Sequence, residues 1–285
     1  MKHLLFALLP LALASAQPTL ADEATLPDVV VTADRTEQSV ARAIPAVTVI
    51  TRAQIDKSPA RDIGDLLRTY AGLQVARSGG LGQQTAVFTR GTESNHTLIL
   101  VDGVPITDGV TGQSFIQNLP LEQIDRIEVV KGPMSSLYGS EAIGGVINII
   151  SRRARDNSGS LRLTAGNHGL REAALTQNLA TQTSSLAATL EGLNYDGTSL
   201  LTGSDVERGY QRRSMTLNGD HRIGNLRLTA LIRDTQGRTE YLGESFLGFP
   251  ALDQDTTQRQ KQVGAEWKDA GPYSTRLLLA ENTEE

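Results

Sequence analysis

The stretch from Val87 to Arg152 most limits what this chain can fold into. It contains short apolar strands separated by glycine-rich turns, and no segment long enough for the helices of a bundle. One strand, Thr97 to Val101, is apolar on both faces and is expected to lie in the centre of a sheet. The stretch therefore predicts a compact unit of short strands and helices, with tight turns at its glycines.

The N-terminus predicts an exported protein. Residues 1–16 begin with the basic Lys2, continue through an apolar run too short to span a bilayer, and end in small residues suited to cleavage before Gln17. No later apolar run is long enough for a transmembrane helix. A transmembrane barrel built from alternating strands is not excluded by this observation. The 285 residues carry a net charge of −5, which argues against nucleic acid as a partner.

Residues 17–44 form a polar leader that is expected to be flexible and that contains one apolar island. An extended apolar segment in such a leader can add itself as a strand to the sheet edge of another protein. An ordinary first strand is the alternative. The island consists of Asp28, Val29, Val30, Val31, Thr32 and Ala33.

Residues 45–155 predict a compact domain in which strands alternate with short helices. Thr51 and Gln54 fit a capping box at the start of one helix. Pro59 is expected to open a second helix, since proline is favoured at the first helical position. The pattern of this part is α+β.

The chain changes character beyond Arg155, where seven short alternating strands follow one another. Leu228 and Ile232 share one face of a strand, whereas Arg227 and Thr229 share the other. Apolar residues toward lipid and polar residues toward a lumen give this pattern, and so does a soluble sandwich with one wet face. The expected strands are Ser160–Ala165, Arg171–Leu179, Ser185–Leu193, Gln211–Asp220, Leu226–Arg233, Gln262–Lys268 and Ser274–Ala280.

The connections between these strands help to separate the two alternatives. Long links, at Asn194–Tyr210 and Thr235–Lys261, alternate with short links at His221–Asn225 and Asp269–Tyr273. Outer-membrane barrels alternate long extracellular loops with short periplasmic turns in this way. The short first connection, Gly166–Leu170, departs from the pattern.

Four motifs within the first stretch carry a resemblance to a known family. They are RG at 90–91, VDGV at 101–104, GP at 132–133 and LYGSEAIGGVIN at 137–148. At this spacing they resemble the plug domain of TonB-dependent outer-membrane receptors. The resemblance implies an α+β plug domain at 45–155, followed at 156–285 by antiparallel transmembrane β-barrel strands. Such receptors close about 22 strands, so the barrel is incomplete in this chain, which is interpreted as an N-terminal portion.

The resemblance also implies a function and partners. The segment 28–33 would be the TonB box, which pairs with the periplasmic energy transducer TonB. The protein would lie in the outer membrane as a monomer, in contact with lipid, and would take up a large, scarce ligand unchanged.

The ligand implied by the resemblance is cobalamin. The chain most resembles cobalamin receptors over nearly all of the sequence after the signal, including 30–35, 78–83 and 138–150. The last run occurs in TonB-dependent receptors generally, so a siderophore or haem receptor stays an alternative. A secreted or periplasmic soluble binding module is the alternative from another class.

Two glycine-containing loops, 77–84 and 105–118, could approach a ligand closely, although solvated hairpin loops are the simpler interpretation. In the plug domains that the chain resembles, the corresponding loops face outward and touch the ligand. The candidate ligand contacts are Ser78, Leu81, Gln83, Gln84, Thr107, Asp108, Val110 and Thr111.

Acidic residues in the long links suggest calcium, which favours clustered carboxylates and backbone carbonyls. Asp196, Asp205, Glu207 and Asp253 align with the calcium ligands of cobalamin receptors. Glu207 stands where that family usually has aspartate. Solvated acidic side chains are the alternative.

Catalytic patterns are missing from the sequence. No two of its four histidines have metal-ligand spacing, and it has neither a G-x-S-x-G motif, a P-loop nor a cysteine nucleophile. The sequence therefore predicts a protein that is not an enzyme and needs no cofactor beyond the possible calcium.

Overall fold

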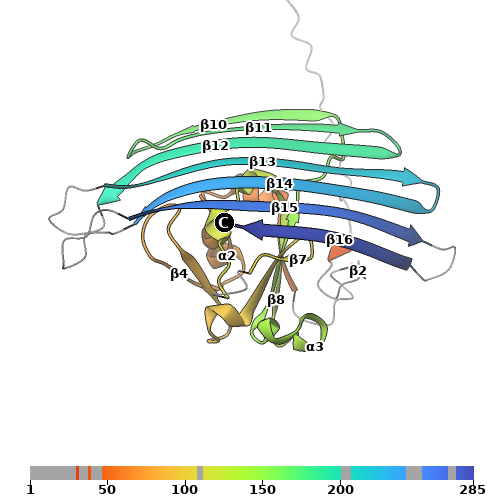
Figure 1. The fold of residues 1–285 in the computed structure, drawn as a ribbon, viewed down its shortest axis with the longest axis horizontal. Coiled ribbons are helices and arrows are strands. Elements are labelled where there is room, and N and C mark those ends of the chain that lie inside the picture. Colours follow the sequence, from red (N-terminus) through yellow and green to blue (C-terminus); the bar gives the residue numbers. More distant parts are fainter. Residues whose placement is uncertain are drawn as a thin grey trace, which may run out of the picture.

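A computed structural model describes residues 30–31, 38–39, 47–107, 112–199, 207–241, 252–268 and 274–285. An α/β unit, formed by residues 47–155, lies beneath a large curved antiparallel sheet formed by residues 158–284 (Figure 1). No helix within these ranges is long and apolar enough to cross a membrane. The predicted signal peptide, at residues 1–16, lies outside the described residues.

A five-stranded sheet forms the centre of the α/β unit. Its strands follow the order β3-β8-β9-β6-β7, in which β6 runs parallel to β9 and the other pairs are antiparallel. The strands are β3 (Val47–Thr51), β6 (Thr97–Val101), β7 (Val104–Pro105), β8 (Ile124–Lys131) and β9 (Gly145–Ser151). The predicted inner strand at 97–101 is confirmed, because β6 has those bounds and all of its residues are buried.

Short helices flank this sheet, and their ends follow the chemistry of capping. At α1 (Arg52–Lys57) the predicted capping box is confirmed, since Thr51 and Gln54 bond each other's backbone N–H groups. The predicted start of the second helix at Pro59 is wrong. Here α2 (Ile63–Tyr70) begins after Asp62, whose carboxylate accepts a hydrogen bond from the Asp65 N–H and is the stronger start signal.

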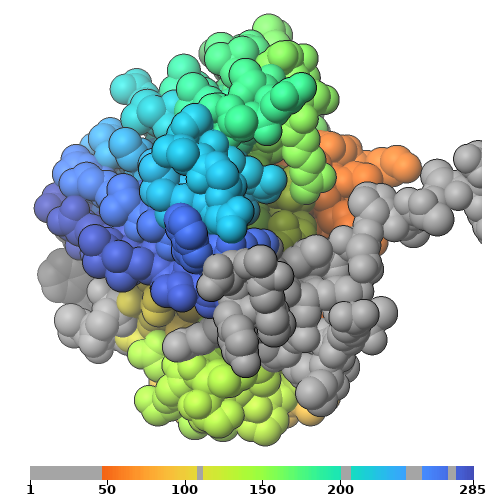
Figure 2. Space-filling view, turned by 90° about the vertical axis from the view of Figure 1, so that its right-hand side faces the viewer, coloured from red at the N-terminus to blue at the C-terminus, as the bar shows by residue number. Residues whose placement is uncertain are grey.

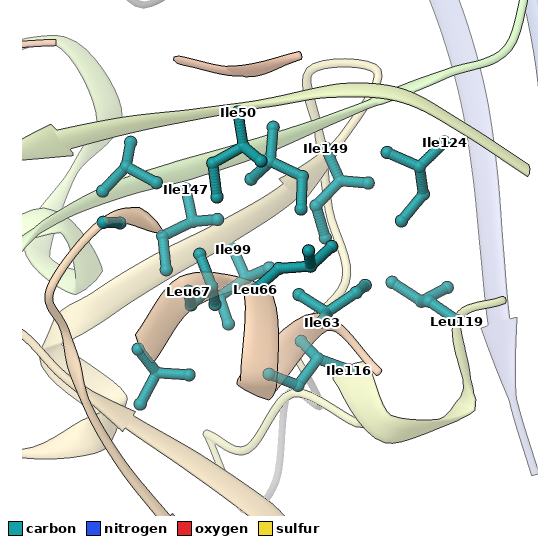
Figure 3. Packing of buried hydrophobic residues seen from close by; sticks show 14 of the residues in the cluster. Ile50, Ile63, Leu66, Leu67, Ile99, Ile116, Leu119, Ile124, Ile147 and Ile149 are labelled. Carbon is teal, nitrogen blue, oxygen red and sulfur yellow. The ribbon is translucent and has the colours of Figure 1, made fainter. Parts of the chain in front are cut away.

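The core of the α/β unit is almost entirely aliphatic. Ile63, Leu66 and Leu67 of α2 pack against Ile147 and Ile149 of β9, with other isoleucines and leucines around them (Figure 3). Burying each such side chain contributes roughly 1.5–3 kcal/mol. This packing supplies a rigid body from which the surrounding loops extend.

The remaining elements of the α/β unit are short. Loop 78–84 joins β4 to β5, which pair as an antiparallel hairpin beside the main sheet. These elements are β4 (Gln74–Arg77), β5 (Thr85–Phe88), α3 (Ser135–Tyr138) and the 3-10 turns η2 (Ser94–His96), η3 (Ile116–Asn118), η4 (Leu121–Gln123) and η5 (Ser140–Ala142).

The large sheet is a meander whose seven strands pair in sequence order. Its strands arch over the α/β unit, and Figure 2 shows them in the same order, from green to blue, in a view turned by 90°. The strands are β10 (Ser158–Ala165), β11 (Arg171–Ala180), β12 (Ser184–Ser199), β13 (Glu207–Ile223), β14 (Leu226–Tyr241), β15 (Leu252–Lys268) and β16 (Ser274–Glu284). The predicted fold class is confirmed: an α+β plug-type unit precedes antiparallel strands, which form an open sheet over the described residues.

The two faces of the large sheet have opposite polarity. Along β13, Arg212 and Ser214 are buried on the concave face, which lies over the α/β unit. The next residue, Met215, is exposed on the convex face. The convex face also exposes Leu163 (72%) and Leu190 (51%). A soluble sheet of this kind buries its apolar face, so the polarity here is inverted.

The strands of the large sheet are longer than the sequence predicts. The predicted link Asn194–Tyr210 is wrong, because β12 continues to Ser199 and β13 begins at Glu207. The predicted link Thr235–Lys261 is wrong for the same reason, since only 242–251 separate β14 from β15. Near these ends most residues on both faces of the strands are polar. The sequence there has no hydrophobic alternation that would predict a strand.

Candidate functional site

The loop 78–84 contains four predicted ligand residues, and two of them hold the loop to the large sheet. The Gln83 side chain is buried, and its Nε2 donates to the carbonyl oxygen of Glu240 at 2.8 Å. The Thr239 hydroxyl donates to the carbonyl oxygen of Gly82 at 3.3 Å. Leu81 packs against an apolar cluster of the sheet made of Leu170, Leu193, Tyr195 and Tyr210. Leu81 and Gln83 are therefore positioned to anchor the loop.

Gly82 fits this loop against a tyrosine ring. Its φ of +79° is a conformation that side-chain-bearing residues rarely adopt, and a Cβ there would lie 2.2 Å from ring atoms of Tyr210. Tyr210 is fully buried, and its hydroxyl donates to Asn118 Oδ1 at 2.9 Å. One tyrosine of the large sheet thus contacts the loop on one side and η3 on the other.

The base of the loop is fixed by a buried carboxylate. Arg77, the last residue of β4, pairs with Asp62 at 2.5 Å and with Asp65 at 3.4 Å. Burial raises the pKa of Asp62 above its ordinary value, and the positive charge of Arg77 opposes that effect. The same carboxylate caps α2, so helix, hairpin and loop share one anchor.

The second predicted loop lies beside the first. Thr107 and Ser114 form an isolated antiparallel bridge at its base, and the Gln84 side chain donates to Gln113 Oε1 at 2.5 Å. Ser78 is exposed and Gln84 is half-buried. The predicted contacts Asp108, Val110 and Thr111 lie outside the described residues, so the ligand role of this loop stays a prediction.

A buried ion pair lies within the large sheet, and its arginine also bonds the α/β unit. Arg212 of β13 donates to Glu191 of β12 at 2.6 Å through Nη2 and at 3.1 Å through Nε. Its Nη1 donates to the carbonyl oxygen of Gln117 at 3.3 Å. The guanidinium also lies 5.9 Å from the ring centre of Tyr210, within the range of cation–π attraction.

Sequence reasoning missed these sheet residues. Glu191, Tyr210 and Arg212 occupy the polar face of strands whose apolar face was recognised. Alternation alone could have assigned Glu191 to the lumen side. It could not have shown that the buried Arg212 donates a hydrogen bond to a backbone carbonyl of η3.

The structure describes little of the predicted TonB box. Val30 and Val31 form the short strand β1 (Val30–Val31), which pairs antiparallel with β2 (Gln38–Ser39). The rest of the segment, Asp28, Val29, Thr32 and Ala33, lies outside the described residues. Binding of TonB to this segment therefore stays a prediction.

The predicted calcium ligands are separated in the part of the chain that the structure describes. Asp253 pairs with Arg238, and Asp196 accepts a hydrogen bond from Asn194 at 3.0 Å. Glu207 begins β13, and Asp205 lies outside the described residues. Within the described ranges no three acidic, histidine or cysteine residues gather as metal ligands. The calcium site stays a prediction.

Comparison with known proteins agrees with this geometry. Residues 40–146 match the family described as the TonB-dependent receptor plug domain. This match covers four strands of the five-stranded sheet and the start of β9, the helices and both candidate loops. The residues of the α/β unit are therefore the part of the chain that is similar to this domain family.

Solved receptor structures share the arrangement of plug and strands. They include the siderophore receptor PirA of Acinetobacter baumannii (21% identity, TM-score 0.67, covering 86% of this chain and 40% of that one). The ferric yersiniabactin uptake receptor FyuA of Yersinia pestis is 18% identical, with a TM-score of 0.68, over 84% of this chain and 41% of that one. The ferripyoverdine receptor of the outer membrane of Pseudomonas aeruginosa, bound to ferripyoverdine, is 16% identical, with a TM-score of 0.71, over 89% of this chain and 36% of that one. At these identities the likeness shows the fold, and the chain spans about two fifths of each receptor.

The contact between Gly82 and Tyr210 yields a prediction. Gly82→Ala should release the loop 78–84, because the new Cβ would collide with the ring as well as strain the backbone. Hydrogen exchange of the amides in 78–84 should rise at least about tenfold, matching a local loss of about 1.4 kcal/mol or more.

Gly72→Ala is the matched control. Gly72 also has a positive φ, of +59°, but nothing lies within 4 Å of its added Cβ. It should leave the exchange of 78–84 unchanged. Equal exchange in both variants would contradict the anchoring of the loop by Tyr210.

The ion pair yields a second prediction. Arg212→Met should lower the free energy of unfolding by roughly 3–5 kcal/mol, because Glu191 would stay buried without its partner. Arg212→Met combined with Glu191→Leu should regain most of that loss. Urea unfolding of the full-length protein in lipid measures both. Arg155→Met, which breaks the pair of the exposed Arg155 with Asp125 (2.9 Å) in the α/β unit, should cost at most about 1 kcal/mol. Equal losses in the two single variants would contradict the account.

Proposed function

We propose that this chain is the N-terminal portion of a TonB-dependent outer-membrane receptor that takes up a scarce ligand by active transport. The plug closes the lumen, its loops 78–84 and 105–118 contact the ligand, and the segment 28–33 recruits TonB. The ligand passes unchanged, so the protein is not an enzyme. Export, outer-membrane location and a monomeric barrel belong to the same proposal.

The inverted polarity of the large sheet is the observation that carries this proposal. Its convex face exposes leucine, isoleucine and valine side chains, whereas its concave face directs buried arginine, glutamine and threonine toward the plug. Lipid around the convex face makes this arrangement favourable, since each buried apolar side chain is then removed from water. A soluble binding module would leave these side chains in water, which disfavours that alternative.

A ferric siderophore is the ligand class that we favour. The similar solved structures include receptors described as siderophore, ferric enterobactin, yersiniabactin and ferripyoverdine receptors. Cobalamin, with or without calcium, is supported by the resemblance of the sequence alone and is the second candidate. Haem is a third.

Energy coupling through the leader would use strand addition. TonB would pair with the backbone of 28–33, and the pull would pass through the leader to β3, the edge strand of the plug sheet. The pairing of β1 with β2 shows that Val30 and Val31 can form a ladder in an extended conformation.

Uptake by the full-length receptor, expressed in a Gram-negative strain without its own receptors, tests the proposal. Labelled ferric siderophores and cobalamin are supplied separately, with and without calcium. Val31→Pro should reduce uptake to background while leaving ligand binding unchanged, because proline removes a ladder donor.

Thr25→Pro, placed before the island, is the control and should transport at the rate of the unaltered receptor. Normal uptake by Val31→Pro would overturn the role of 28–33. Accumulation of cobalamin and of no siderophore would overturn the ligand assignment.

A further inference from the structure

A groove of about 730 Å³ runs across the convex face of the large sheet. Leu175, Leu190, Met215 and Ile232 line it from four successive strands, in a nearly continuous apolar row. Its depth comes from small residues beside larger ones. Gly192 lies in the lining, and nothing is within 4 Å of the position of a Cβ there.

Basic side chains border one side of this groove. Arg213, Arg259 and Lys261 line it together with the half-buried carboxylate of Asp234. Arg259 pairs with Asp234 at 2.9 Å and Lys261 pairs with Glu281 at 3.1 Å. Arg213 is exposed, and among the described residues it makes no ion pair within 4 Å, so its charge is available to a ligand.

The order of these groups along the strands matches an amphiphile. Arg213 lies toward the start of β13 at Glu207, and Met215 follows it toward the turn at Ile223. On β14, Ile232 is nearer the turn than Gln236, which is the register partner of Arg213. A phosphate held by Arg213 would therefore point toward the loop ends, and an acyl chain could run over the apolar row.

We propose that this groove binds an anionic, phosphate-bearing lipid of the surrounding membrane. The phosphate accepts hydrogen bonds from Arg213, as guanidinium groups favour phosphate, and occupies the open space at Gly192, the register partner of Arg213. One acyl chain runs from there along Leu190 and Met215 toward the turns. A lipid bound in this way fills the groove, which the mobile acyl chains of the surrounding bilayer would pack less closely. The inference depends on the proposed location in a membrane.

Native mass spectrometry of the full-length protein, delipidated in a neutral maltoside detergent, tests the proposal. Phosphatidylglycerol, which is anionic, should bind more tightly than the net-neutral phosphatidylcholine. Arg213→Gln should weaken phosphatidylglycerol binding about fivefold, because one basic residue near a lipid surface contributes about 1 kcal/mol. Gly192→Phe should weaken both lipids, since its ring would occupy this open space.

Arg222→Gln, on the same strand but at its turn end, is the matched control and should change neither affinity. Equal phosphatidylglycerol binding by the Arg213→Gln and Arg222→Gln variants would overturn the phosphate site. Unchanged binding by Gly192→Phe would overturn the placement of the phosphate beside Arg213. Dimers without retained lipid would assign the groove to a second copy of the chain. Membrane fractionation of the unaltered receptor separately tests the proposed location.

Discussion

Buried polar side chains on the concave face of the large sheet form hydrogen bonds to the plug, and the rest of the structure depends on these contacts. Each such group left without a partner would cost about 1–3 kcal/mol. Gln260 and Gln262 both donate to the carbonyl oxygen of Val101, at 3.1 and 3.3 Å. Gln123 donates to the Ser214 hydroxyl. The plug is thus held mainly by distributed polar contacts, together with the small apolar cluster around Leu81. Such contacts are specific, and each is weak enough to be exchanged for water.

The loop 78–84 is held by contacts of the same kind. Its base is fixed by Asp62 and Arg77, its middle by Gln83 and its turn by the Tyr210 ring. Ser78, at the edge of the loop, is exposed. A ligand that binds here would therefore contact a loop already connected to both the plug and the sheet. That connection gives a physical route by which occupancy could alter plug–sheet contacts, starting from the hydrogen bonds at Gly82 and Gln83.

Much of the fold could be predicted from the sequence, because local signals and packing agree. The capping box at Thr51 and the inner strand at 97–101 are examples. The start of α2 was misplaced because a proline was preferred to the capping Asp62. Strand ends near Ser199 and Glu207 were missed because both faces there are polar. The anchoring of Gln83 depends on a residue that is far away in the sequence, Glu240, so no local pattern contains it. The alternation of polar and apolar residues was recognised, but only the structure shows that the polar face is the covered one.

Lipid contact on the convex face is the central claim, and paired single cysteines test it most directly. The chain has no native cysteine, so each introduced cysteine can be spin-labelled alone. Val263 is exposed on the convex face, and its neighbour Gln262 is buried on the concave face. In the reconstituted full-length receptor, a label at Val263→Cys should be relaxed by membrane-dissolved oxygen and shielded from a water-soluble nickel reagent. A label at Gln262→Cys should be immobilised and shielded from oxygen. Stronger relaxation by nickel than by oxygen at Val263→Cys would place that face in water and contradict the account.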